Sequence, residues 1–145
     1  MADEKPTPPV DIRDTNKTVI ADYRAQSGDV GDRAPLVLLT TIGAKSGNPH
    51  TTPVCVGTDG DDLIVAGSMG GRSRHPQWYR NLVADPELTV EYMGDKYQAR
   101  ATTVSNSAER DGLFAQMSQY IQGLYGYQDR CREHRQIPIV RLQRA

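Results

Sequence analysis

Cysteines, aromatic residues and long apolar runs are all scarce in this chain of 145 residues. Its two cysteines, Cys55 and Cys131, form no CxxC pair and are too few for a disulfide framework, which favours a reduced, cytoplasmic protein. Because no run of about 18 apolar residues occurs, the sequence predicts no transmembrane helix. The net charge of −1 lacks the basic excess typical of nucleic-acid-binding proteins, so no nucleic-acid partner is expected.

The N-terminal segment is charged, rich in proline and poor in apolar residues. Its first residues, "MADEKPTPPVDIRD", have no apolar core of the kind found in secretory signals. A short helix is expected over residues 15–26, but without the basic amphipathic face that docks a helix on a membrane. We therefore expect residues 1–33 to be an extension, partly disordered or helical, and residues 34–145 to form one domain.

The remaining sequence alternates short β-branched runs with turn residues. These runs predict about six strands, mostly joined by tight hairpins, together with two or three helices. Pro53 assigns its strand to an edge or a bulge, Pro76 is expected at the first position of a helix, and Asn106 is expected to cap another. The expected strands cover residues 34–43, 50–57, 62–68, 87–104 (a hairpin) and 137–144. This pattern predicts an α+β fold, a small split β-barrel that is mostly antiparallel with flanking helices.

The segment "GAKSG" (43–47) contains the glycine, lysine and serine of a nucleotide-binding P-loop. A P-loop needs four residues between its first glycine and the Gly-Lys pair, followed at once by a helix. Here only Ala44 separates Gly43 from Lys45, and prolines with a β-branched run follow. The segment is therefore interpreted as a hairpin turn, either simply solvated or able to hold an anion through its amides, Lys45 and His50.

Three segments together carry a family resemblance. "LLTTIGAKSGNPHTTPV" resembles the pattern LLTTxGRKSGxPRxTPL, "VAGSMGGRSRHPQWYRNLVADPELTV" resembles VASxGGxxxxPxWYxNLxAxPxVxV, and "REHRQIPIVRL" resembles TDRxIPVVxL. All three patterns belong to the deazaflavin-dependent nitroreductase family. The resemblance covers residues 36–142 and implies an FMN-binding-like split barrel that uses reduced coenzyme F420.

The family resemblance also implies an activity. Reduced F420 would deliver a hydride to a small, hydrophobic, electron-poor acceptor, such as an enone, a quinone or a nitro compound, while the protein orients the reactants. Two alternatives stay open at this point. One is a split-barrel oxidoreductase that uses FMN, and the other is a non-catalytic protein that binds a cofactor or a lipid on the same barrel. The oligomeric state is also open.

The resemblance implies a cofactor site built from four segments. The hairpin turn would contact the phosphate, the following strand would run along the cofactor, the next turn would lie under the deazaflavin ring, and a short helix would complete the pocket. The residues implied are Lys45, Ser46, His50, Thr51, Thr52, Pro53, Val54, Cys55, Ala66, Gly67, Ser68, Met69, Gln77, Trp78, Tyr79, Arg80 and Asn81. The family pattern has arginine where Ala44 and His50 stand.

Three hydroxyl-bearing residues are candidates for catalysis. Ser68 has no base in sequence reach that would make it a nucleophile, but its hydroxyl could donate to the negative charge that a hydride creates on the acceptor. Tyr125 and Tyr127, in the tyrosine-rich segment that the family places at the substrate side, could do the same. No set of His, Cys, Asp and Glu has metal-site spacing, so no metal is expected.

Overall fold

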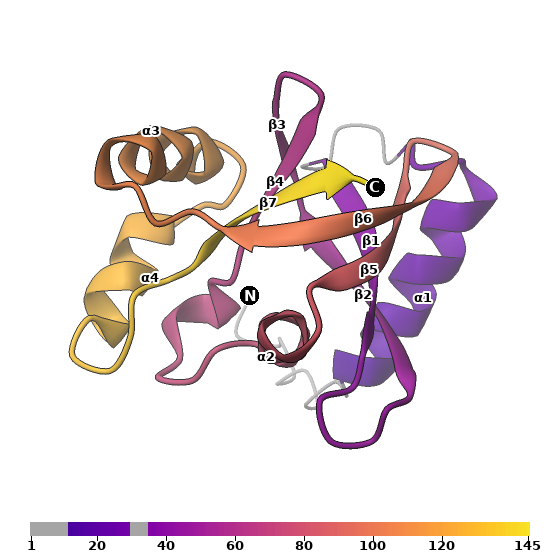
Figure 1. The fold of residues 1–145 in the computed structure, drawn as a ribbon, viewed down its shortest axis with the longest axis horizontal. Coiled ribbons are helices and arrows are strands. Elements are labelled where there is room, and N and C mark those ends of the chain that lie inside the picture. The colour runs from indigo at the N-terminus through magenta and orange to yellow at the C-terminus, as the bar shows by residue number, and fades with distance from the viewer. Residues whose placement is uncertain (1–11, 30–34) are drawn as a thin grey trace, which may run out of the picture.

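The structure, a computed structural model, describes residues 12–29 and 35–145, and within them one sheet forms the centre of the fold. Seven antiparallel strands run in the order β2-β1-β5-β6-β7-β4-β3 and curl into a half barrel (Figure 1). The strands are β1 Leu36–Ile42, β2 Pro49–Cys55, β3 Gly57–Asp59, β4 Asp62–Ala66, β5 Glu87–Tyr92, β6 Asp95–Thr103 and β7 Ile139–Arg144. The predicted antiparallel α+β architecture is confirmed.

Four α-helices and one 3-10 turn flank the sheet in the described part of the chain. They are α1 Ile12–Ala25, η1 Met69–Gly71, α2 Gln77–Ala84, α3 Ser107–Ser118 and α4 Leu124–Cys131. α3 and α4 lie together at one end of the sheet and α1 lies at the other, alongside β2 (Figure 1). None of the described helices is long and apolar enough to cross a membrane.

Side chains on the two faces of the sheet enter two separate apolar clusters. Leu63 and Val65 of β4 pack with Trp78 and Leu82 of α2. Ile64, between them in sequence, points the other way and packs with the side chains of α3 and α4. Because successive side chains of a strand alternate between faces, burial on both faces explains why β4 has a continuous apolar run instead of alternation.

The local signals predict most elements, and the differences have simple causes. β2 is an edge strand, as Pro53 indicated, and the Asn106 side chain caps α3 by accepting from the Glu109 amide at 3.0 Å. Pro76 was expected inside its helix but is the residue before it, with an extended ψ of 154°. The chain pairs again at β3, giving seven strands instead of about six, and α4 begins directly after Gly123, whose φ is 83°.

Candidate functional site

An elongated groove runs along the edge strand β2. Two adjoining cavities, each of about 430 Å³, share Asn16, Thr52, Gln77 and Trp78 in their walls. Together these cavities extend from one end of β2 to the other, between α1, α2 and the segment that enters η1. Their concave shape and their volume are typical of ligand-binding sites, which usually enclose a few hundred Å³.

The two ends of the groove differ in chemistry. One end is lined mostly by polar residues, with Lys17 of α1, His50 and Thr51 of β2, and Gln77 and Asn81 of α2 in its wall beside Ile20 and Trp78. The other end is largely apolar. Its wall contains Pro53, Val54, Cys55, Ala66, Ser68, Met69, Pro76 and Ile121. A ligand with a flat apolar ring at one end and a polar chain at the other matches this gradient.

Asn81 holds the polar end together. Its side chain is almost fully buried, and its Oδ1 accepts from the Ala44 amide at 3.0 Å and from Gln77 Nε2 at 2.8 Å. Its Nδ2 donates to Thr41 Oγ1 at 3.0 Å. One amide thus links β1, the turn between β1 and β2, and α2. Position 81 therefore needs a side chain that accepts through an oxygen and donates through a nitrogen, as the asparagine amide does.

Arg135 holds the apolar end together. This residue is only 9% exposed, and its guanidinium donates to three backbone carbonyls of one loop: Arg72 at 2.9 Å, Gly67 at 2.8 Å and Ser68 at 2.8 Å. The loop needs this support because Met69 has a left-handed φ of 45°, which is costly for a side chain other than glycine. Arg135 therefore fixes the backbone that presents Ser68 and Met69 to the groove.

His75 contacts the same guanidinium. Arg135 Nη1 lies 3.1 Å from His75 Nδ1, and because arginine only donates, Nδ1 must accept and be unprotonated. Burial lowers the pKa of His75 below its ordinary value, and the positive charges of Arg135 and Arg80 lower it further. His75 is therefore a neutral imidazole at neutral pH, with its proton on Nε2.

This neutral imidazole predicts a sensitivity to acid. Folding lowers the pKa of His75 from its unfolded value near 6.5, so the neutral form stabilises the folded protein fully above that pH. This stabilisation is lost as the pH falls through the pKa of His75 in the folded protein. We expect the melting temperature to fall between pH 7.5 and pH 5. His75→Asn, whose amide oxygen can replace Nδ1 as an acceptor without titrating, should reduce that fall. Thermal melts at both pH values test this, and an equal fall in the two proteins would contradict it.

The structure brings most of the expected site residues to the groove. Those lining it are His50, Thr51, Thr52, Pro53, Val54, Cys55, Ala66, Ser68, Met69, Gln77, Trp78 and Asn81. Five others lie around it without being among its lining residues: Lys45, Ser46, Gly67, Tyr79 and Arg80. Ser46 Oγ lies 3.5 Å from His50 Nε2, so the hairpin turn is adjacent to the polar end.

The two candidate catalytic tyrosines are also absent from the residues that line the groove. Tyr125 is 57% exposed and packs edge-on against Phe114, with ring centroids 4.9 Å apart. Tyr127 packs against the cluster under α3 and α4, and its backbone lies against Gly71: a Cβ on that glycine would approach the Tyr127 Cα to 2.8 Å. Their catalytic roles stay predictions, and Tyr127 has an evident packing role.

Sequence reasoning missed several residues of the groove. α1 contributes Asn16, Lys17 and Ile20, although its residues were placed in an extension outside the domain. Arg135 lies in the segment "REHRQIPIVRL" that resembles the family pattern, but the sequence predicted no role for it. The sequence does not show which backbone carbonyls an arginine will contact, because every residue type has a backbone carbonyl. Within the described residues, no group of three or more His, Cys, Asp or Glu could hold a metal ion.

Known proteins are similar to this chain in both sequence and fold. A sequence profile of the F420H2-dependent quinone reductase family matches residues 15–144. An F420H2-dependent quinone reductase of Mycobacterium tuberculosis (strain H37Rv) is 33% identical over 131 residues, covering 84% of this chain and 85% of that protein. The expected family resemblance is thereby confirmed, and the match includes residues 15–25 of α1.

Solved structures agree. An F420H2-dependent reductase, FDR-A, superposes with a TM-score of 0.66 at 26% identity, covering 78% of this chain and all of that one. A structure described as a domain-swapped dimer gives 0.69 at 25% identity, covering 91% and 96%. The heme storage protein HutZ of Vibrio cholerae, at 15% identity and a TM-score of 0.56, shares the fold. The predicted split-barrel fold is confirmed, and the chain belongs to the F420H2-dependent quinone reductase family.

Proposed function

We propose that the protein binds reduced F420 in the groove along β2 and passes a hydride to a quinone-type acceptor at the apolar end. The observation that carries this proposal is the polar-to-apolar gradient of the groove, in a chain that belongs to a family of F420H2-dependent quinone reductases. The free thiols of Cys55 and Cys131 support a reducing compartment, and we place the protein in the cytoplasm.

The donor set of the groove fits this cofactor. F420 joins a flat deazaflavin to a chain that carries a phosphate and glutamates. The apolar end offers Val54, Ala66 and Met69 to a flat ring, and Trp78 lines both cavities where they meet. The polar end offers cationic and hydrogen-bonding side chains but, among the described lining residues, no carboxylate that would repel an anion. We assign the ring to the apolar end and the anionic chain to the polar end.

The protein's part in the reaction is to orient the reactants, exclude water and support the developing charge. Bound reduced F420 supplies the hydride, and its redox chemistry is its own. The apolar wall around Met69 and Ile121 would reduce the contact of the reacting atoms with water. Hydride addition to a quinone leaves negative charge on an oxygen, which one proton then converts to a hydroquinone. The Ser68 hydroxyl, at this end, can donate to that oxygen.

The proposal is tested by mixing the purified protein with reduced F420 and, separately, with FMN. We expect F420 to bind, and a quinone to re-oxidise reduced F420 at a rate proportional to protein concentration. Tight binding of FMN with no response to F420 would favour the FMN-dependent alternative and overturn the proposal. Binding of neither cofactor would favour the non-catalytic alternative. A panel of quinones, enones and nitro compounds then ranks the acceptors by kcat/KM.

Ser68→Ala should lower kcat for the quinone about tenfold, because it removes a donor to charge that develops in the transition state. Its effect on the Kd for F420 should stay within about twofold, since one neutral hydrogen bond is at most a small part of binding. Ser105→Ala, an exposed serine in the linker before α3, is the matched control. Stopped-flow oxidation of reduced F420 measures both constants, and an unchanged kcat would remove Ser68 from the mechanism.

A further inference from the structure

We infer that Lys17, on α1, makes the cationic contact to the anionic chain of the cofactor, so that α1 is part of the binding site. The inference rests on the proposed function and assigns a residue that neither the family pattern nor the sequence reasoning singled out. Lys17 lines the polar cavity together with His50 of β2 and Asn81 of α2. Lys17 thus adds α1 to the elements that line the polar cavity, beside β2 and α2.

The charges of the polar end support this assignment. Among its described lining residues, Lys17 is the permanently cationic one, and His50 is the other group able to carry positive charge. The rest of the wall consists of two apolar residues, Ile20 and Trp78, and of neutral donors and acceptors: Asn16, Thr51, Thr52, Gln77 and Asn81. A cavity with a lysine, no lining carboxylate and several neutral donors is suited to phosphate or carboxylate oxygens.

The position of Lys45 strengthens the case. The resemblance gives Lys45 the phosphate contact, and both lysines are exposed, but Lys45, in the turn between β1 and β2, is not among the residues that line either cavity. The family's arginines are replaced at Ala44 and His50, so this turn has less positive charge than the pattern specifies. Lys17 supplies a cation to the same end of the groove from another element.

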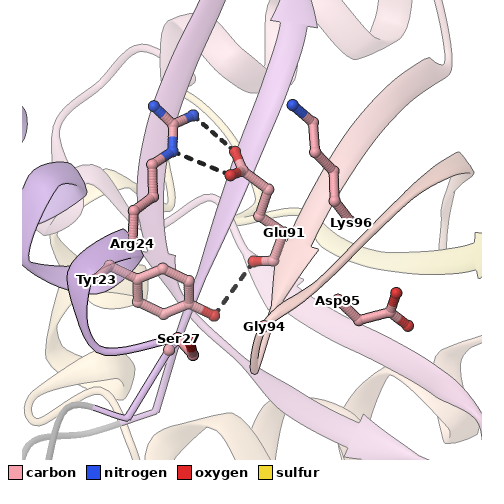
Figure 2. Close-up of a pocket in the computed structure, with 8 residues that line it drawn as sticks. Tyr23, Arg24, Ser27, Glu91, Gly94, Asp95 and Lys96 are labelled. Carbon is pink, nitrogen blue, oxygen red and sulfur yellow. Dashed lines mark hydrogen bonds and ion pairs between the residues drawn. The ribbon is translucent and has the colours of Figure 1, made fainter.

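α1 is attached to the sheet in a way that keeps Lys17 over the groove. Near its C-terminal end, Arg24 forms a two-pronged ion pair with Glu91 of β5, at 3.0 and 2.8 Å. The Tyr23 hydroxyl donates to the Glu91 carbonyl at 3.2 Å and accepts from the Met93 amide at 3.2 Å. Figure 2 shows both side chains approaching from α1, with Arg24 at the Glu91 carboxylate and Tyr23 at the Glu91 backbone carbonyl. With that end fixed, the preceding turns of the helix extend along β2 and place Lys17 at the cavity.

The experiment compares two ligands: F420 and the tail-less deazaflavin, which has the ring but neither phosphate nor glutamates. Their Kd values are measured by fluorescence titration at low and high salt. Lys17→Gln should weaken F420 binding about tenfold, as expected for one charge-assisted hydrogen bond near the surface, and should flatten the salt dependence. The same variant should leave the affinity for the tail-less ligand unchanged, because that ligand has no anion to contact.

Two further variants sharpen the comparison. Lys96→Gln removes an exposed lysine on the far side of the Arg24–Glu91 pair and should change neither Kd. If Lys45→Gln weakens F420 binding tenfold and Lys17→Gln does not, the anion contact belongs to the hairpin turn and the inference is wrong. If the unmodified protein binds neither deazaflavin, the proposed function fails instead. Equal weakening of both ligands by Lys17→Gln would show that the lysine only supports the fold, which also overturns the inference.

Discussion

Replacing Arg135 by Met should destabilise the protein by about 3 kcal/mol, because three backbone carbonyls lose a shared donor and the one on Gly67 is in a buried hydrogen bond. Methionine fills similar space but donates nothing. The loop from Gly67 to Arg72 would then have to keep its left-handed Met69 without that support. Urea denaturation followed by tryptophan fluorescence measures the change, and Trp78, the single tryptophan, reports from the neighbouring helix.

Two further substitutions separate geometry from charge. Arg135→Lys keeps the positive charge but has no planar fork, so it should recover only part of the lost stability. Arg132→Met changes an exposed arginine one turn earlier and should be close to neutral. We also expect Arg135→Lys to raise KM for the quinone more than the Kd for F420. The loop it supports lies at the apolar end, where the quinone would bind, whereas F420 would also be held through its anionic chain at the polar end. Equal stability of Arg135→Met and the unmodified protein would refute the role of this guanidinium.

The second large effect is expected for Asn81→Leu, at about 2–3 kcal/mol of lost stability. Leucine has a similar volume but leaves the fully buried Thr41 hydroxyl without its donor and the Ala44 amide without its acceptor. The turn between β1 and β2 would detach from α2, and the polar end of the groove would lose its shape. The melting temperature should therefore fall by roughly 5–10 °C for a domain of this size.

A double-mutant cycle distinguishes this hydrogen-bonding role from simple packing. Thr41→Val removes the other partner with little change of shape, so adding it to Asn81→Leu should restore some of the lost stability. Strictly additive losses would argue that the two side chains act independently. Leu82→Met, a near-isosteric change at a buried neighbour on α2, should cost less than the Asn81 variant.

The sequence predicted the fold well where local signals and tertiary context agree. The hairpin from Glu87 to Thr103 alternates in both strands, and the Asn106 cap starts α3 as expected. The three-residue strand β3 was missed because so short a segment has no periodicity. α1 was assigned to an extension because its apolar residues are few, and its packing depends on Tyr23 and an ion pair to a strand 67 residues away.

The site was predictable in part, for a related reason. Most motif residues of β2 line the groove, as do Gln77, Trp78 and Asn81 of α2, since they are neighbours in sequence within elements that the pattern identifies. Arg135 and Lys17 reach the site from distant segments, and what they contact is decided by the fold: backbone carbonyls in one case and a cavity wall in the other. Contacts between segments that are far apart in the chain follow no fixed spacing, so a single sequence does not predict them.

The place of β7 in the sheet has a consequence for how the chain folds. β7 comes last among the strands in sequence but lies between β6 and β4, pairing Thr102 with Arg141 on one side and Leu63 with Leu142 on the other. Without it, β2-β1-β5-β6 and β4-β3 are two unjoined ribbons, each with an exposed edge. A nascent chain therefore cannot close its sheet until residues 139–144 have left the ribosome, and the earlier strands must be kept from pairing with other chains until then.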